Sequence, residues 1–350
     1  MSISIQTSLF NYKDIFLPVQ ALRDVSIEHV LGIDGIREAA TIECDTNGLS
    51  RGIMFFEERN GIMTPAEISF VNGEYQISIS LTFCQFVWAV GLYMTAYFDN
   101  IIQIPNMNAA GTNIHGYKVD KNHVEYANEQ FRLARSLMWG YNHDVFFELP
   151  NICDPMEYSE PIGKANGVLL GGVAFMFCHE LSHNILGHTQ KDSTDDESVA
   201  EEAAADDYAL DMLSDTFDSN WGFNHKVGAA TVLCSLLMMG EDSISGGSRH
   251  PHMDYRIQMM MKKFNLHKMD SLWGFVGSVI RLWLLVYGGL TIQEDMKTGG
   301  FDFYQNFYEH YLGLLTQVRE LRYPKLVKPN MVCGIMNKSL TFNVIKMRLL

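Results

Sequence analysis

The sequence predicts an α+β fold in which a smaller N-terminal region, made of an antiparallel sheet and a helix, precedes a mostly helical remainder. Two patterns lead to this prediction. Runs of strand-forming residues separated by Asn-Gly pairs occur near the N-terminus, whereas almost every segment from Gly163 onward has helical spacing of its apolar residues. Residues 106–121 are rich in turn-forming residues and lack periodicity, so we expect one domain at residues 1–120 and another at residues 121–350.

The composition is that of a folded protein with a large core. The 350 residues are 47% hydrophobic and 12% aromatic. The formal net charge of −15, without a Lys/Arg cluster, argues against a nucleic-acid partner. The six cysteines lie far apart and form no CxxC pair, so neither a thiolate zinc knuckle nor a disulfide framework is indicated. Because the N-terminus also lacks the pattern of a secretory signal, we expect a cytoplasmic protein.

Two apolar runs, residues 81–98 and 272–292, are each long enough to cross a bilayer. Gln85 lies within the first run and Arg281 near the centre of the second, and both side chains would be costly to place in lipid. We therefore expect helices buried within the protein. Membrane spans, and with them a membrane-associated protein, are the alternative.

The clearest strand signal is a hairpin around Asn72 and Gly73. Asn-Gly favours a two-residue hairpin turn, and apolar residues alternate with polar ones from Tyr75 to Leu81. A second Asn-Gly pair, at residues 47 and 48, separates ATIEC from RGIMFFEE and predicts a second hairpin in the same sheet. The residues from Leu81 onward then form a helix that packs on this sheet.

An amphipathic helix is predicted after the turn-rich segment. Its apolar residues recur at steps of three and four, namely Val124, Ala127, Phe131, Ala134 and Met138. The following sequence HDVFFEL, residues 143–149, predicts a short strand.

The strongest functional signal is HELSH, in which His179, Glu180 and His183 form an H-E-x-x-H motif. Residues four apart on an α-helix are rotated by only about 40°, so both imidazoles can bind one metal ion while Glu180 can reach a water on that metal. The preceding segment is apolar on every side, and its Gly171 and Gly172 would allow a close helix contact. The alternative is two surface histidines on an ordinary helix, so companion residues must decide.

His188 is the first candidate for a third ligand. The metzincin pattern needs a histidine six residues after His183, and that position is Thr189. Gly187 is expected to end the helix, so His188 begins the exit loop. We therefore favour a role for His188 facing the helix dipole or hydrogen bonding, with metal ligation as the alternative.

A better third ligand lies in the acidic, alanine-rich segment that follows. Ser198 and Glu201 have the spacing of a capping box, so a helix is expected to begin near Ser198. Glu202 and Asp206 then share one helix face, which lets Glu202 bind the metal while Asp206 accepts a hydrogen bond from a ligand histidine. The alternative is an acidic, solvated helix.

A third motif, HPHMDYRI at residues 250–257, completes a resemblance to a known family. H-E-x-x-H, then E-x-x-A-D (here EAAAD), then H-P-x-x-x-x-R-I resembles the gluzincin zinc metallopeptidases, in particular those of the HtpX and CAAX-protease type. The same arrangement without obvious membrane spans is similar to the phage-exclusion Lit peptidase family. The resemblance covers residues 171–257 and leaves the first 120 residues without a match.

The resemblance implies a zincin-like peptidase domain with one catalytic Zn²⁺ ion. Its ligands would be His179, His183 and Glu202, which leave a fourth position for water. Glu180 would be the general base that takes a proton from the zinc-activated water.

The resemblance also implies roles for residues around this centre. Asp206 would be the carboxylate behind a ligand histidine. His250 would lie over the zinc-bound water and stabilise the oxyanion, and Arg256 matches the arginine six residues further on. His252 competes with His250, but only His250 is followed by proline and has arginine at the family spacing. Cys178, just before the first ligand, is interpreted as a packed thiol.

The predicted function is therefore a zinc-dependent endopeptidase that acts on a protein substrate, and the resemblance implies a place in phage defence. Residues 1–120 would recognise the substrate or a trigger, and residues 144–149 could offer a strand edge to the substrate. Two alternatives stay open: an integral membrane quality-control peptidase of the HtpX type, and a metal-binding regulatory module without catalysis. Neither the substrate nor the oligomeric state can be inferred from the residues.

Overall fold

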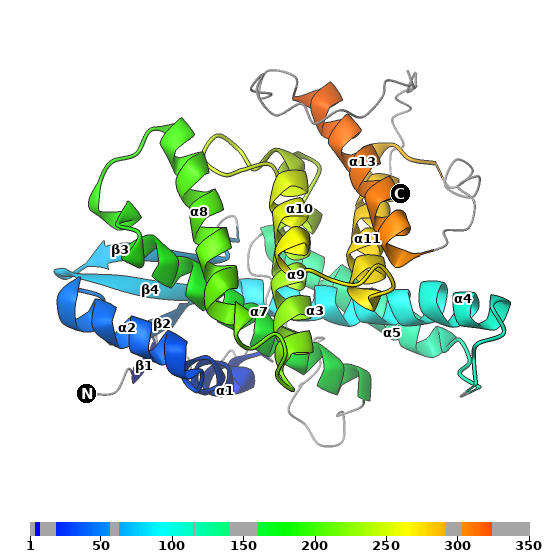
Figure 1. The fold of residues 1–350 in the computed structure, drawn as a ribbon, viewed down its shortest axis with the longest axis horizontal. Helices are drawn as coiled ribbons and strands as arrows, with labels where there is room; N and C mark the ends of the chain where they lie inside the picture. The colour runs from blue at the N-terminus through cyan, green and yellow to red at the C-terminus, as the bar shows by residue number, and fades with distance from the viewer. Residues whose placement is uncertain are drawn as a thin grey trace.

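The computed structural model describes residues 4–7, 19–56, 63–114, 116–139, 160–291 and 303–323. It confirms the predicted α+β fold class, because a small mixed sheet lies at one end of the molecule and helices make up most of the rest (Figure 1). The strand predicted at residues 143–149 lies outside the described residues.

The sheet has four strands in the order β1-β2-β4-β3. Their bounds are β1 Ser4–Thr7, β2 Gly52–Phe56, β3 Ala66–Val71 and β4 Glu74–Ser80. Strands β3 and β4 form the predicted antiparallel hairpin, in which Asn72 and Gly73 both have positive φ (53° and 93°), as a tight Asn-Gly turn requires. The hairpin leaves β3 at the edge of the sheet.

The second predicted hairpin is wrong. The ATIEC residues lie in helix α2 (Asp34–Thr46), which follows α1 (Gln20–Leu31), and β2 pairs in parallel with β1 and β4. Ile36, Ala40 and Glu43 are the buried residues of α2, and their spacing of four and three is helical. Burial against the rest of the protein outweighs the strand preference of the β-branched Thr41 and Ile42.

The predicted helix after the hairpin is confirmed as α3 (Leu81–Tyr97), whose first turn is capped by the Ser80 hydroxyl, which accepts a hydrogen bond from the Phe83 N–H. A π-helical stretch, Phe98–Gln103, joins it to α4 (Ile104–Ala109). The predicted amphipathic helix is α5 (Lys121–Ser136). Because α3, which precedes residues 106–121, packs against α5, which follows them, the two parts share one core, and their division into domains stays a prediction.

The remaining helices are α7 (Glu160–Ile185), α8 (Asp195–Ser214), α9 (Gly222–Met238), α10 (Met253–Lys263), α11 (Ser271–Trp283) and α13 (Tyr304–Arg322). The predicted start of α8 is wrong by one turn. Thr194 and Glu197 form the capping box, whereas Ser198 is buried and accepts hydrogen bonds from Arg249. Both pairs have the required spacing, but only Thr194 precedes the acidic first turn.

Three helical stretches are long and apolar enough to cross a membrane: Leu81–Ala109, Pro161–Ile185 and Ser271–Gly288. More than half of each apolar stretch is nevertheless buried within the protein. Arg281, in the last of them, donates a hydrogen bond to the Tyr97 hydroxyl of α3. This burial favours the interpretation as packed helices.

Helix α7 lies at the centre of the fold and packs against α1, α3, α8 and α9. Its contact with α9 depends on glycine, as predicted. A Cβ on Gly171 would lie 2.2 Å from the Asn224 carbonyl oxygen, and one on Gly228 would lie 2.3 Å from the Gly172 nitrogen. The two backbones therefore approach more closely than any other residue type would permit.

A pair of histidines, a partly buried His29 and a buried His225, connects α1 to α9. The Nε2 atoms of His29 and His225 are 2.8 Å apart, and His225 Nδ1 lies 2.6 Å from the Thr216 hydroxyl. Burial lowers the pKa of both histidines, that of His225 to about 4. Both imidazoles are therefore neutral at pH 7.

Replacing Gly228 by Ala should force α7 and α9 apart and lower the free energy of unfolding by about 2–3 kcal/mol. Urea unfolding of the purified protein measures this change. Gly313→Ala is the matched control, because Gly313 lies within α13 with no atom near its missing Cβ, and the substitution should raise stability by up to about 1 kcal/mol. Equal effects of the two substitutions would contradict the close-contact interpretation.

The histidine pair should make stability depend on pH. The unfolded chain takes up a proton at His225 near pH 6.5 and the folded protein only near pH 4, so stability is lost as the pH falls between these values. We expect His225→Gln to remove about 1–2 kcal/mol of this loss in urea unfolding measured from pH 7 to pH 4.5. His267→Gln, at an exposed histidine, should leave the wild-type dependence in place.

Candidate metal centre

The structure brings together the three side chains that the sequence proposed as metal ligands. His179 and His183 lie one helical turn apart near the end of α7, and Glu202 reaches them from α8. The distances between their ligand atoms are 3.2 Å from His179 Nε2 to His183 Nε2, 3.3 Å from His179 Nε2 to Glu202 Oε2, and 3.4 Å from His183 Nε2 to Glu202 Oε1. Three lone pairs can therefore point at one ion.

Within the described part of the chain, this is the one group of three or more His, Cys, Asp or Glu side chains whose atoms are close enough to share a metal ion. All three are largely buried, with side-chain exposures of 11%, 12% and 18%. Neutral imidazoles and carboxylates are ligands of transition metals. The residues present thus fit a metal ion.

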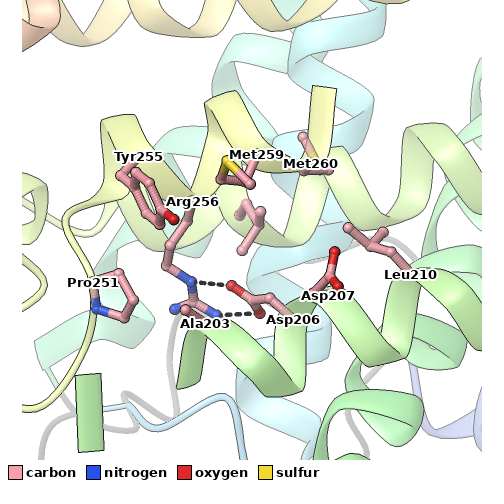
Figure 2. Close-up of a pocket in the computed structure, with 10 residues that line it drawn as sticks. Ala203, Asp206, Asp207, Leu210, Pro251, Tyr255, Arg256, Met259 and Met260 are labelled. Atoms are coloured by element: carbon pink, nitrogen blue, oxygen red, sulfur yellow. Dashed lines mark hydrogen bonds and ion pairs between the residues drawn. The ribbon is translucent and has the colours of Figure 1, made fainter. Parts of the chain in front are cut away.

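Asp206 lies behind the first ligand. Its Oδ1 is 3.0 Å from His179 Nδ1, and it accepts two hydrogen bonds from Arg256, from Nε at 2.7 Å and Nη2 at 2.8 Å. Figure 2 shows this bidentate ion pair between Asp206 of α8 and Arg256 of α10, beside a small, mostly apolar pocket. Burial raises the pKa of Asp206, but the charge of Arg256 and the contact with His179 outweigh it and hold the pKa well below its usual value.

The carboxylates of Asp206 and Glu202 favour a positive charge within the cluster. Burial lowers the pKa of His179, but Asp206 and Glu202 outweigh it and raise the pKa to about 10. Burial has the opposite effect on Glu202 and raises its pKa, but the neighbouring histidines, His179 first among them, lower this pKa to about 2. The surroundings of His179 thus favour positive charge where a metal ion would be held.

Glu180 is a buried carboxylate whose pKa is raised. It is buried beside the cluster, and burial together with the charges of Glu202 and Glu67 raises its pKa to about 7. The charge of His179 and a hydrogen bond from the backbone N–H of Ile68 act in the opposite direction. A carboxylate with a pKa near neutrality can both take and return a proton.

The contact with Ile68 was not foreseen. Ile68 lies in β3, an edge strand of the sheet that also contacts α7, and its N–H reaches Glu180, so the edge of the sheet runs past the cluster. A second unforeseen contact joins α2 to α7, where Asn184 donates a hydrogen bond of 2.7 Å to the buried carboxylate of Glu43. Glu43 shares the helical spacing of the buried residues Ile36 and Ala40. This spacing could have indicated a buried role for Glu43 if the segment had been predicted as a helix rather than a strand.

The structure places His250 at the cluster and His252 away from it. His250 Nε2 lies 3.6 Å from Glu202 Oε1, and its side chain is half exposed. His252 Nδ1 is instead 2.7 Å from the Ser245 carbonyl oxygen. The turn before His250 is held by Gly246, whose φ is 67° and whose Cβ would lie 2.3 Å from the Pro251 oxygen.

The other two residues near the motif do not join the ligands. Cys178 is fully buried, and burial raises the pKa of its thiol, as expected of a packed side chain. His188 follows Gly187, whose φ of 70° turns the chain out of the helix, and its Nδ1 lies 3.1 Å from Nδ1 of His183. His188 thus makes the kind of hydrogen-bonding contact favoured from the sequence.

Comparison with known proteins finds one family whose model covers this part of the chain. The family model Peptidase U49 matches residues 77–276, which include α3 and all of α7, α8 and α10. No curated protein and no solved structure matches the chain. The matched segment is more than half of the chain and contains every residue of the cluster. The chain therefore belongs to the Peptidase U49 family and is a peptidase.

Proposed function

We propose that this peptidase is a zinc-dependent endopeptidase that cleaves a protein substrate in the cytoplasm. The observation that carries the proposal is the triangle of ligand atoms 3.2–3.4 Å apart. Tetrahedral zinc with bonds of about 2.0–2.1 Å places its ligand atoms about 3.3–3.4 Å apart. His179, His183 and Glu202 would hold the ion, and three protein ligands are typical of catalytic rather than structural zinc.

When bound, zinc would supply a Lewis acid that makes water a better nucleophile and polarises the peptide carbonyl. Glu180 takes a proton from the attacking water and passes it to the leaving amine, a double role that suits a pKa of about 7. His250, close to Glu202 and half exposed, can donate a hydrogen bond to the carbonyl oxygen as negative charge develops there.

The edge of β3 supports a peptide-binding role beside this centre. In an antiparallel pair, the N–H and C=O of one residue point to the same side of the strand. Because the N–H of Ile68 faces Glu180, its carbonyl also faces away from β4, and an extended peptide can pair with this edge. We propose β3 as the strand that holds the substrate. Residues 144–149, the edge considered from the sequence, lie outside the described residues.

The similarity to the phage-exclusion Lit peptidases extends the proposal to phage defence, with a host protein such as a translation factor as the substrate. Residues 1–120 would recognise that substrate or a trigger, and the Glu43–Asn184 contact gives this region a connection to α7. Of the alternatives, a regulatory metal module would not need Glu180 as a base. A membrane peptidase of the HtpX type would use the three apolar helices as spans, so purification without detergent would contradict it.

Replacing Glu180 by Gln should lower proteolysis at least about 100-fold while zinc stays bound, because the base is lost and the ligands are not. Mass spectrometry of cells that express wild type or variant should detect substrate fragments with wild type alone, which would also identify the substrate. Elemental analysis measures the zinc. Glu38→Gln, at an exposed residue of α2, is the control and should cleave like wild type. Unchanged fragments with Glu180→Gln would contradict the mechanism.

Replacing Asp206 by Asn should weaken zinc binding about 10–100-fold, because His179 loses the carboxylate behind it. It should also lower the free energy of unfolding by about 3–5 kcal/mol, because Arg256 is left buried without its counter-charge. Chelator competition and urea unfolding measure the two effects. The neighbouring Asp207→Asn breaks only a solvent-exposed ion pair with Lys263 and should change neither quantity by much. Similar results for both variants would refute the assigned role.

A further inference from the structure

His188 lies against the side of His183 that faces away from the metal cluster. The rings of His183 and His188 meet edge to face, with centroids 5.1 Å apart and planes at 69°. The two Nδ1 atoms are 3.1 Å apart, whereas the cluster uses Nε2 of His183. Because Nδ1 and Nε2 lie on different edges of an imidazole, His188 cannot bind the same ion through this contact.

The contact fixes where each hydrogen must be when a metal is bound. A histidine that offers its Nε2 lone pair to a metal carries its hydrogen on Nδ1. His183 therefore donates from Nδ1, and His188 must accept with the lone pair on its own Nδ1. His188 then carries its hydrogen on Nε2. One specific pair of tautomers satisfies both the metal and the hydrogen bond.

The surrounding turn holds His188 in this position. Gly187, in a left-handed conformation, turns the chain back beside α7, and Thr189 follows with its hydroxyl 3.4 Å from the Asn184 amide oxygen. The carbonyl oxygen of Thr189 accepts a hydrogen bond of 3.3 Å from the Tyr75 hydroxyl of β4. Contacts to both α7 and the sheet thus fix the turn.

A carboxylate from α8 completes the surroundings of His188. Burial has the larger effect and lowers the pKa of His188, but the negative charge of Glu201 acts on this imidazole to raise it. Glu201 is itself fixed, by a hydrogen bond of 2.7 Å from the Ser193 hydroxyl and an ion pair of 2.8 Å with Lys191. Glu201 precedes Glu202 in α8, so the helix that carries the third proposed ligand also places a negative charge near His188.

We propose that His188 is a positioning residue for the metal centre: by accepting a hydrogen bond from His183 Nδ1, it fixes the tautomer and ring orientation that direct His183 Nε2 to the metal. Asp206 plays the matching part behind His179. The two ligand histidines are thus held by different means, one by a carboxylate and the other by an imidazole. This inference rests on the proposed zinc site, since without a metal the hydrogen on His183 is not assigned.

The test compares two substitutions of similar size, His188→Asn and His188→Leu. The Asn side-chain oxygen can stand where Nδ1 stood and accept the hydrogen bond, whereas Leu cannot accept one. Zinc dissociation constants are measured by chelator competition, and the absorption spectrum of the Co²⁺-substituted proteins reports the ligand geometry. We expect His188→Leu to weaken zinc binding about 10–100-fold and alter the Co²⁺ spectrum, and His188→Asn to stay close to wild type in both.

Gln190→Ala, at an exposed residue of the same turn, is the control for disturbance of the turn and should bind zinc like wild type. Equal affinities of the Asn and Leu variants, with matching Co²⁺ spectra, would overturn the inference and leave the zinc site intact. A wild-type protein that binds no zinc would instead contradict the proposed function and the inference with it. Thermal unfolding of the metal-free variants shows whether a weaker site reflects the lost acceptor or a lost fold.

Discussion

The central constraint on this structure is a buried cluster of three side chains from two helices, His179, His183 and Glu202. Their nitrogen and oxygen atoms lie within 3.4 Å of one another. Such a cluster is electrostatically costly unless a cation occupies it. The helices around it supply the fixed geometry. The glycine contact presses α9 against α7, and the Asp206–Arg256 pair ties α8 to α10. The cluster is therefore a product of helix packing rather than of a flexible loop.

The same packing explains the chemistry around the cluster. Burial raises the pKa of Glu180 to about 7, and the edge of β3 lies within hydrogen-bonding reach of it. The N-terminal region thus contributes more than a separate module would, because its sheet provides a backbone edge at Glu180 and Glu43 contacts Asn184, the residue next to His183. A peptide paired with β3 would pass the base and the metal together.

Local sequence patterns predicted much of the fold and of the cluster. H-E-x-x-H and E-x-x-x-D predicted the three side chains that meet in the cluster, because residues four apart share a helix face, and Asn72-Gly73 predicted the hairpin. The predictions were wrong where burial determined the secondary structure, as in α2, and where a second residue with the same spacing formed the cap, as Thr194 does for α8. Contacts between distant segments, such as Ile68 with Glu180, leave no local signature. Which nitrogen of His183 faces His188 likewise depends on the turn that Gly187 makes.

An X-ray absorption spectrum of the zinc-loaded protein tests the metal centre most directly, because it reports the atoms bound to the ion without any substrate. The proposed site predicts two imidazole nitrogens and about two oxygens at about 2.0–2.1 Å, with no sulfur. Sulfur at about 2.3 Å, which would implicate a cysteine such as Cys178, or a shell of oxygens alone, would contradict the assignment of His179, His183 and Glu202.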